Sequence, residues 1–205
     1  MNLPTQLTVL RIILTPIFFY TLFLEPLFYK FFSFIIFGIA SLTDLYDGYY
    51  AKKYGDVTKW GKFLDPLADK ILVSSALIAF NILGYIKLWI ILVIIIRDFL
   101  ITGLRSYALY KEHPIVTREW ARWKTFIQMT SVFIVFLFIL IDDFAVYYQK
   151  QFTFINIIKD IGFVDKLMTF VAILTAITGI LYLIENRDHI KSIVRNCYQI
   201  FVPSD

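Results

Sequence analysis

Four of the aspartates within residues 44–69 have types and spacing that suit metal chemistry. Asp44 and Asp47 are three residues apart, and Asp65 and Asp69 are four apart, so on a helix each pair shares one face. Carboxylates facing one another repel strongly in a low-dielectric setting unless cations neutralise them. Carboxylate oxygens prefer hard ions. The pattern predicts two Mg²⁺ or Mn²⁺ ions, bridged by shared aspartates, that clamp a phosphate-bearing substrate.

Small residues accompany these carboxylates. Gly48 follows Asp44 by four positions, and Gly61 precedes Asp65 by four, so each carboxylate has nearly bare backbone beside it. We interpret that space as room for a substrate. Two other interpretations remain open: solvated charges that pair with Lys52 and Lys62, or a pathway for cations or protons.

The composition indicates which elements must position these residues. Of the 205 residues 59% are hydrophobic and 18% charged, with a mean hydropathy of +0.71, which is typical of an integral membrane protein. We therefore expect an all-α polytopic protein, with a single membrane domain over residues 1–205 and no nucleic-acid partner. Six transmembrane helices are predicted from the apolar runs at 9–25, 31–51, 62–84, 86–109, 125–141 and 167–184, with a loop over 142–166.

Lysines and arginines gather between the second and third predicted spans and between the fourth and fifth. An excess of these residues marks the cytoplasmic side of a membrane protein. Both termini are therefore predicted to be cytoplasmic, and the aspartates to open towards the cytoplasm from the cell (inner) membrane.

A second polar group interrupts the fourth predicted span. Asp98, Thr102 and Arg105 share a helix face, and Arg97 lies beside them among apolar residues. Arginines within a span are costly and usually face a polar cavity, so an anionic acceptor substrate would give them a partner. Further positive charge on the same side comes from Arg118, Arg122 and Lys124. For Arg118 and Arg122 individually, membrane topology alone is favoured over direct contact with the acceptor.

The aspartate segment is similar to the signature of the CDP-alcohol phosphotransferases, which reads DxxDGxxAR and, eight residues later, GxxxDxxxD. All spacings agree for seven positions: Asp44, Asp47, Gly48, Ala51, Gly61, Asp65 and Asp69. One position departs, because Lys52 stands where the family has arginine. Lysine keeps the charge but not the two-pronged hydrogen bonding of a guanidinium.

The resemblance implies a role for each matched residue. Asp44, Asp47 and Asp65 would bind a first metal ion, and Asp44, Asp65 and Asp69 a second, with Asp69 also the general base. The cytidine diphosphate would lie against Gly48, Lys52, Thr58, Gly61 and Thr8. For Thr8, capping of the first helix is the other explanation. The resemblance also implies a homodimer.

Further stretches resemble the branch of this family that makes phosphatidylglycerophosphate from CDP-diacylglycerol and sn-glycerol 3-phosphate: NLPTQLTVLRI, KFLDPLADKILV, RDFLITGLR and WKTFIQ. On this interpretation Arg105 and Lys124, with Arg118 and Arg122, would hold the phosphate of the acceptor. A family member of the cardiolipin synthase or phosphatidylinositol-phosphate synthase type is the nearest alternative, and a cation transporter is the alternative from another class.

Overall fold

The computed structural model describes residues 3–54, 59–110, 119–149 and 153–187, and every regular element in these ranges is an α-helix. The prediction of an all-α protein is confirmed. The helices are α1 (Leu3–Leu22), α2 (Leu27–Tyr54), α3 (Lys59–Ile82), α4 (Leu88–Tyr110), α5 (Glu119–Tyr147), α6 (Thr153–Ile161) and α7 (Phe163–Glu185).

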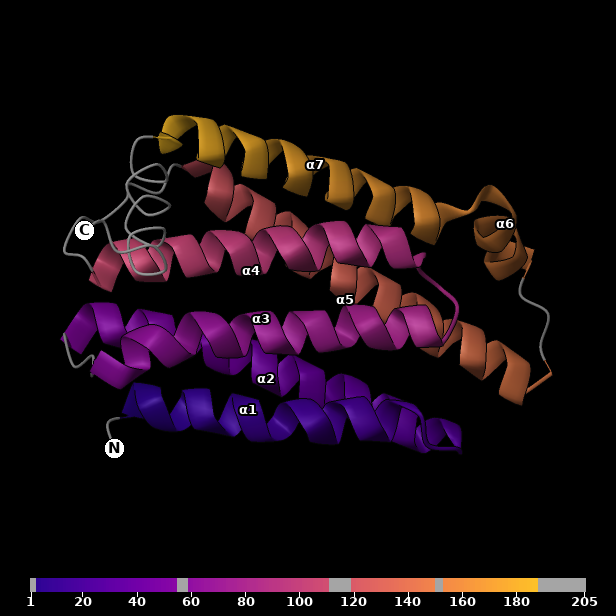
Figure 1. The fold of residues 1–205 in the computed structure, drawn as a ribbon. Helices are drawn as coiled ribbons and strands as arrows, with labels where there is room; N and C mark the ends of the chain where they lie inside the picture. Colours follow the sequence, from indigo (N-terminus) through magenta and orange to yellow (C-terminus); the bar gives the residue numbers. More distant parts are fainter. Residues whose placement is uncertain (1–2, 55–58, 111–118, 150–152, 188–205) are drawn as a thin grey trace, which may run out of the picture.

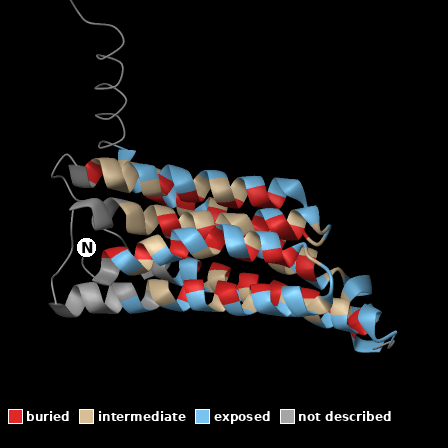
Figure 2. Cartoon of the chain, turned by 90° about the horizontal axis from the view of Figure 1, so that it is seen from below, coloured by how far each residue is buried: buried red, intermediate tan, exposed pale blue. Residues whose placement is uncertain are grey.

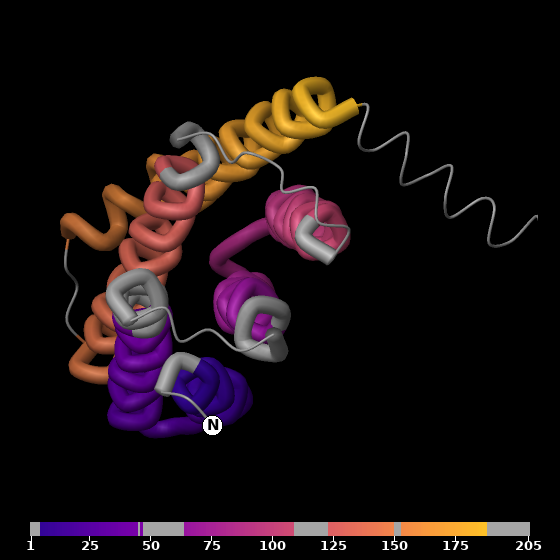
Figure 3. Tube along the Cα trace, turned by 90° about the vertical axis from the view of Figure 1, so that its left-hand side faces the viewer, coloured from indigo at the N-terminus to yellow at the C-terminus, as the bar shows by residue number. Residues whose placement is uncertain are grey.

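All helices except the short α6 run side by side along one common direction (Figure 1). α1, α3 and α5 begin at the end of the bundle where α2, α4 and α7 finish, and we call this the site end. Seen end-on, the helices form a ring in the order α1, α2, α5, α7, α4, α3 (Figure 3), and each packs against its neighbours in that order. The parts of α2 and α3 that carry the aspartates therefore lie at the same end as the last turns of α4 and the first turns of α5.

The turn between α3 and α4 depends on a glycine. Gly84 has a φ of +82°, in the left-handed region that favours glycine. Its amide donates to the carbonyl of Asn81 at 2.8 Å, and the Tyr85 amide donates to the carbonyl of Phe80 at 2.9 Å. These bonds satisfy carbonyls that the end of a helix leaves without partners, so the chain can reverse within a few residues.

The core contains a cluster of phenylalanines from four helices. Phe18 of α1, Phe37 of α2, Phe80 of α3 and Phe136 of α5 are each 0% exposed. The ring centroids of Phe18 and Phe37 are 5.3 Å apart, and those of Phe80 and Phe136 are 5.4 Å apart. Such aromatic pairs contribute about 0.5–1.5 kcal/mol each beyond their buried area. This cluster fixes α1, α2, α3 and α5 relative to one another in the interior of the bundle.

Ion pairs join the helices at the opposite end. Lys30 of α2 lies 2.8 Å from Asp143 of α5, and Lys159 of α6 lies 2.5 Å from Asp142. The Tyr85 hydroxyl donates to Asp142 at 2.7 Å, and burial together with this bond raises the pKa of Tyr85. The prediction of a loop over 142–166 is wrong. α5 continues to Tyr147, and α6 forms because its apolar residues recur at helical spacing.

Four helices are long and apolar enough to cross a membrane: α1, α2, α5 and α7. Large apolar side chains are exposed along them, and buried and exposed residues alternate along the helices in Figure 2. α3 and α4 are not among these four helices because they carry more charge. A stretch of 18 residues is about the length that crosses a membrane. Every such stretch of α4 contains Arg97, Asp98 and Arg105, and every such stretch of α3 contains at least Asp69 and Lys70. The chain is thus a membrane protein, and the membrane crossing by α3 and α4 stays a prediction.

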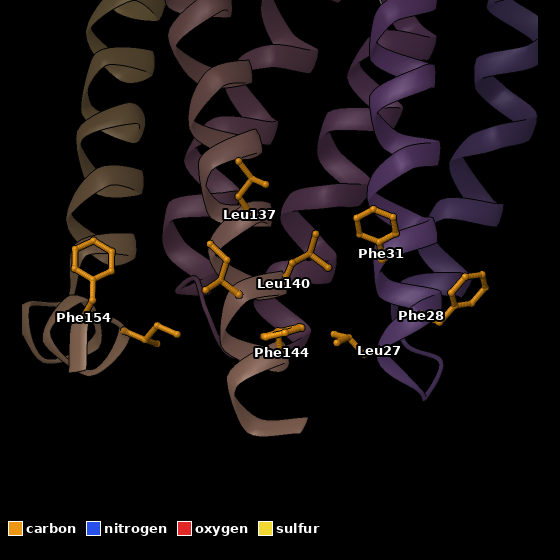
Figure 4. Close-up of a pocket in the computed structure, with 9 residues that line it drawn as sticks. Leu27, Phe28, Phe31, Leu137, Leu140, Phe144 and Phe154 are labelled. Atoms are coloured by element: carbon orange, nitrogen blue, oxygen red, sulfur yellow. The ribbon is translucent and has the colours of Figure 1, made fainter. Parts of the chain in front are cut away.

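A cavity of about 630 Å³ lies at the end opposite the site end (Figure 4). It is lined only by apolar residues of α2, α5 and α6: Leu27, Phe28, Phe31, Leu137, Leu140, Ile141, Phe144, Phe154 and Ile155. With no polar group in its wall, this cavity cannot bind a phosphate or a metal ion. The chemistry predicted from the sequence must therefore take place elsewhere.

Candidate active site

The signature residues lie on two neighbouring helices at the site end. Asp44 lies in α2, whereas Asp65 and Asp69 lie one turn apart in α3. Asp47, Gly48 and Lys52 also belong to α2, and Gly61 belongs to α3, but their side chains lie outside the described part of the structure. Thr58 lies outside the described residues altogether. The two halves of the signature are thus brought together by the antiparallel packing of α2 and α3, which both contact α1.

Helix α1 contacts these carboxylates. The Arg11 guanidinium lies 2.9 Å from the Asp44 carboxylate, and the Thr8 hydroxyl donates to Asp65. Both α1 side chains are 0% exposed. Thr8 and Arg11 are three residues apart, so they share the helix face that meets α2 and α3. Thr8 was predicted to lie near this site, whereas no role at the site was predicted for Arg11.

The described carboxylates suit a divalent cation in the chemistry of their donors. Asp44 interacts electrostatically with Asp65 and Asp69, and all three offer the oxygen ligands that Mg²⁺ and Mn²⁺ prefer. Among the residues whose side chains are described, no three such groups enclose a metal site. Each carboxylate instead has a partner from the protein; for Asp69 it is Lys70, at 2.5 Å. No role was predicted for Lys70.

A cavity of about 630 Å³ at the site end joins the two polar groups found in the sequence. Asp44 and Asp69 line one wall, and Arg97, Asp98 and Arg105 of α4 line another. Further polar residues around it are Ser41, Lys70, Thr102, Thr125, Gln128 and Thr130. Carboxylates that suit metal ions and arginines that suit an anion therefore face the same space. A substrate with two phosphate-bearing parts could contact both walls at once.

Asp98 connects α4 to α5 beside this cavity. Its carboxylate accepts hydrogen bonds from Lys124, from the Gln128 amide at 3.1 Å and from Arg97 at 3.1 Å. Lys124 is 2% exposed and is not part of the cavity wall. A lysine this deeply buried needs a counter-charge, and Asp98 supplies it. Lys124, predicted from the sequence as a phosphate contact, thus lies behind Asp98.

Arg105 faces the cavity more directly. It lines the wall, and its guanidinium interacts with the Tyr182 hydroxyl of α7. Its buried Nε–H has no hydrogen-bond partner within the described part of the chain, so this donor remains available to a ligand. The other two predicted phosphate contacts cannot be placed: Arg122 belongs to α5 but its side chain is not described, and Arg118 lies outside the described residues.

Residues 1–178 match the CDP-alcohol phosphatidyltransferase family, and the chain belongs to this family of membrane enzymes. Members of the family generally use divalent metal ions.

Three bacterial relatives share the name CDP-diacylglycerol–glycerol-3-phosphate 3-phosphatidyltransferase. The relative from Wigglesworthia glossinidia brevipalpis is 35% identical over 170 residues, 78% of this chain and 92% of its own length. The relative from Bacillus subtilis is 40% identical over 144 residues, 64% of this chain and 74% of its own. The one from Rickettsia bellii is 36% identical over 136 residues, 66% of this chain and 75% of its own.

Proposed function

We propose that this chain transfers the phosphatidyl group of CDP-diacylglycerol to sn-glycerol 3-phosphate, giving phosphatidylglycerophosphate and CMP. The observation that carries the proposal is the single cavity with Asp44 and Asp69 on one wall and Arg105 on another. The names of the relatives support the same reaction. An acceptor with its own phosphate suits an arginine-lined wall, because a guanidinium binds phosphate oxygens with two directed hydrogen bonds.

The aspartate wall takes the nucleotide end of the donor. Asp44, Asp47, Asp65 and Asp69 would hold two ions, Mg²⁺ or Mn²⁺, which when bound supply positive charge to the transferring phosphate and the leaving group. The CDP part would lie against Thr8, Gly48, Lys52, Thr58 and Gly61, the positions that match the family pattern. Asp44 and Asp65 are also held by Arg11 and Thr8, so α1 fixes the orientation of the two carboxylates.

Asp69 would serve as the general base. It lines the cavity at the wall nearest the other carboxylates, where the acceptor hydroxyl must approach the donor. The hydroxyl oxygen forms a new bond to the phosphorus that carries diacylglycerol, the bond from that phosphorus to CMP breaks, and Asp69 takes the hydroxyl proton. Most of the remaining catalysis is positioning of the two substrates.

The acceptor phosphate would bind at the α4 wall. Arg105 is the principal contact, and Lys124 adds charge from behind Asp98. Arg118 and Arg122 would extend the positive charge towards the cytoplasm. Arg105, in the last turns of α4, and Lys124, in the first turns of α5, lie near the site end, where a small anion would enter from water.

The proposed setting is the cell (inner) membrane, with six spans, both termini and the active site on the cytoplasmic side, and one domain over residues 1–205. The common direction of the helices supports this arrangement, because α1 begins and α7 ends at the site end (Figure 1). Homodimerisation is part of the proposal and rests on the family resemblance.

A panel of acceptors tests the proposal. Purified enzyme with Mg²⁺ and labelled CDP-diacylglycerol would receive one acceptor at a time: glycerol 3-phosphate, glycerol, phosphatidylglycerol or inositol phosphate. We expect CMP release and labelled phosphatidylglycerophosphate with glycerol 3-phosphate only, and no product with chelator. Efficient turnover of phosphatidylglycerol or inositol phosphate would identify the other family branches. Cation flux in sealed vesicles without CDP-diacylglycerol would identify a transporter.

A further inference from the structure

One glycine of α7 makes room for an arginine of α4. A Cβ built on Gly179 would lie 2.8 Å from Cγ of Arg97 and 3.3 Å from its Nε. The first distance is shorter than real Cβ contacts, and the atom concerned is in the stem of the side chain rather than at its flexible end. By contrast, a Cβ at Gly38 or Gly103 would meet nothing within 4 Å. The absence of a side chain at 179 is therefore a specific requirement of Arg97.

Arg97 is held between two helices by its polar end. Its Nη1 donates to Asp98 at 3.1 Å, and its Nη2 donates to the Thr178 hydroxyl at 3.2 Å. That hydroxyl in turn donates to backbone carbonyls of α7, of which the Leu174 oxygen is 2.9 Å away. Thr178 and Gly179 thus fix where the guanidinium lies, one through a hydrogen bond and the other through bare backbone.

The position of Arg97 matters because it lines the cavity next to Asp98. The partly exposed Arg97 and the buried Asp98 and Lys124 form a cluster with two positive charges and one negative, a formal charge of +1. Charges in a low-dielectric wall act strongly on an anion nearby. If Arg97 moves away, the remaining pair of Asp98 and Lys124 is formally neutral, so the wall loses one positive charge while Arg105 and the aspartates remain.

We propose that Gly179, with Thr178, is a positioning residue that holds Arg97 against Asp98 and so adds a second positive charge, beside that of Arg105, to the α4 wall that attracts the acceptor phosphate. This inference rests on the proposed function. It concerns a residue just beyond residues 1–178, the part of the chain that matches the family.

The test is Gly179→Ala, with Gly38→Ala as the matched control. Both changes add one methyl group within a long helix, but only the first meets Arg97. At saturating CDP-diacylglycerol we expect Gly179→Ala to raise KM for glycerol 3-phosphate about tenfold, the scale of one weakened charge-assisted contact. The values of kcat and of KM for CDP-diacylglycerol should stay within about twofold. Gly38→Ala should leave all three constants unchanged.

A second comparison separates positioning from a general loss of packing. If Gly179 acts through Arg97, the double variant Gly179→Ala/Arg97→Gln should have the same acceptor KM as Arg97→Gln alone. Thr178→Val, which removes only the hydroxyl partner, should raise the acceptor KM in the same direction. Three results would overturn the inference. The first is an acceptor KM in the double variant that rises by the product of the two single effects. The others are an unchanged acceptor KM for Gly179→Ala and an equal rise in acceptor KM for Gly38→Ala. The proposed function is tested separately, by whether the unmutated enzyme turns over glycerol 3-phosphate at all. The role of Gly179 is tested by the ratio of the acceptor KM of each variant to that of the unmutated enzyme.

Discussion

The carboxylate of Asp98 offers the sharpest test of how the α4 wall is held together. Asp98→Asn keeps the shape of the side chain and one acceptor oxygen, so it removes mainly the charge. Lys124, 2% exposed, would then be a buried ammonium without its counter-charge. Breaking one partner of a buried ion pair typically costs about 3–5 kcal/mol. Arg97 loses less, because it is 15% exposed and keeps its bond to Thr178. We therefore expect the free energy of unfolding to fall by about 3–5 kcal/mol.

The assay is equilibrium unfolding in mixed detergent micelles, followed by helical circular dichroism. The control is Lys87→Met, because Lys87 pairs with Asp165 at 3.0 Å on an exposed surface, and such pairs contribute about 0–1 kcal/mol. The double variant Asp98→Asn/Lys124→Met removes both charges and should recover at least half of the loss. If Asp98→Asn costs no more than Lys87→Met, or if the double variant recovers nothing, the buried pair does not hold α4 against α5.

Three further predictions concern catalysis. Chelation of divalent ions should abolish turnover, and added Mg²⁺ or Mn²⁺ should restore it. Asp44→Asn should lower kcat at least a hundredfold even with excess metal. Full activity in the presence of chelator would contradict the metal site. Asp69→Asn should lower kcat by about 10²–10⁴, the contribution of a general base, while CDP-diacylglycerol binding measured by titration persists; equal loss of binding would make Asp69 chiefly a ligand. Arg11→Met should lower kcat by about tenfold or more through misplacement of Asp44, with no change in KM for glycerol 3-phosphate; a change confined to the acceptor KM would place Arg11 elsewhere.

The spacing of the aspartates was enough to predict part of the site. Asp65 and Asp69 share a face because of helix geometry alone, and the structure places them one turn apart in α3. The approach of Asp44 to this pair follows from two long helices joined by a short connection. The contribution of Arg11 could not be predicted in the same way, because a lone arginine near the start of a span also fits the rule that marks the cytoplasmic side.

The α4 wall shows the limit of sequence reasoning more clearly. The charged residues of α4 indicated a polar cavity, and such a cavity exists. Their partners come from residues far along the chain: Lys124 is 26 positions from Asp98, and Thr178 is 81 positions from Arg97. These pairings depend on the order of helices around the ring, which spans that are apolar on all sides do not specify. For the same reason nothing in the sequence marked Gly179 as the neighbour of Arg97.

The helix α6 was missed for a different reason. It has nine residues, far fewer than a span requires, and it lies within a segment whose charges suggested a solvated loop. The spacing of Phe154, Ile155, Ile157, Ile158 and Ile161 was the available signal, since it is the pattern of an amphipathic helix. Short amphipathic helices of this kind are better recognised from periodicity than from mean hydropathy.

The central claim is that the aspartate wall and the arginine wall serve different substrates in one cavity, and a single titration tests it most directly. Glycerol 3-phosphate would be titrated at saturating CDP-diacylglycerol for the unmutated enzyme, Arg105→Ala and Arg105→Lys, with Lys87→Ala as a control for loss of a positive charge outside the cavity. Loss of a charge-assisted hydrogen bond to phosphate, worth about 1.5–3 kcal/mol, should raise the acceptor KM of Arg105→Ala about tenfold to a hundredfold and leave KM for CDP-diacylglycerol unchanged. Lysine at this position should restore only part of the affinity. An unchanged acceptor KM in Arg105→Ala, or an equal rise for both substrates, would contradict the account.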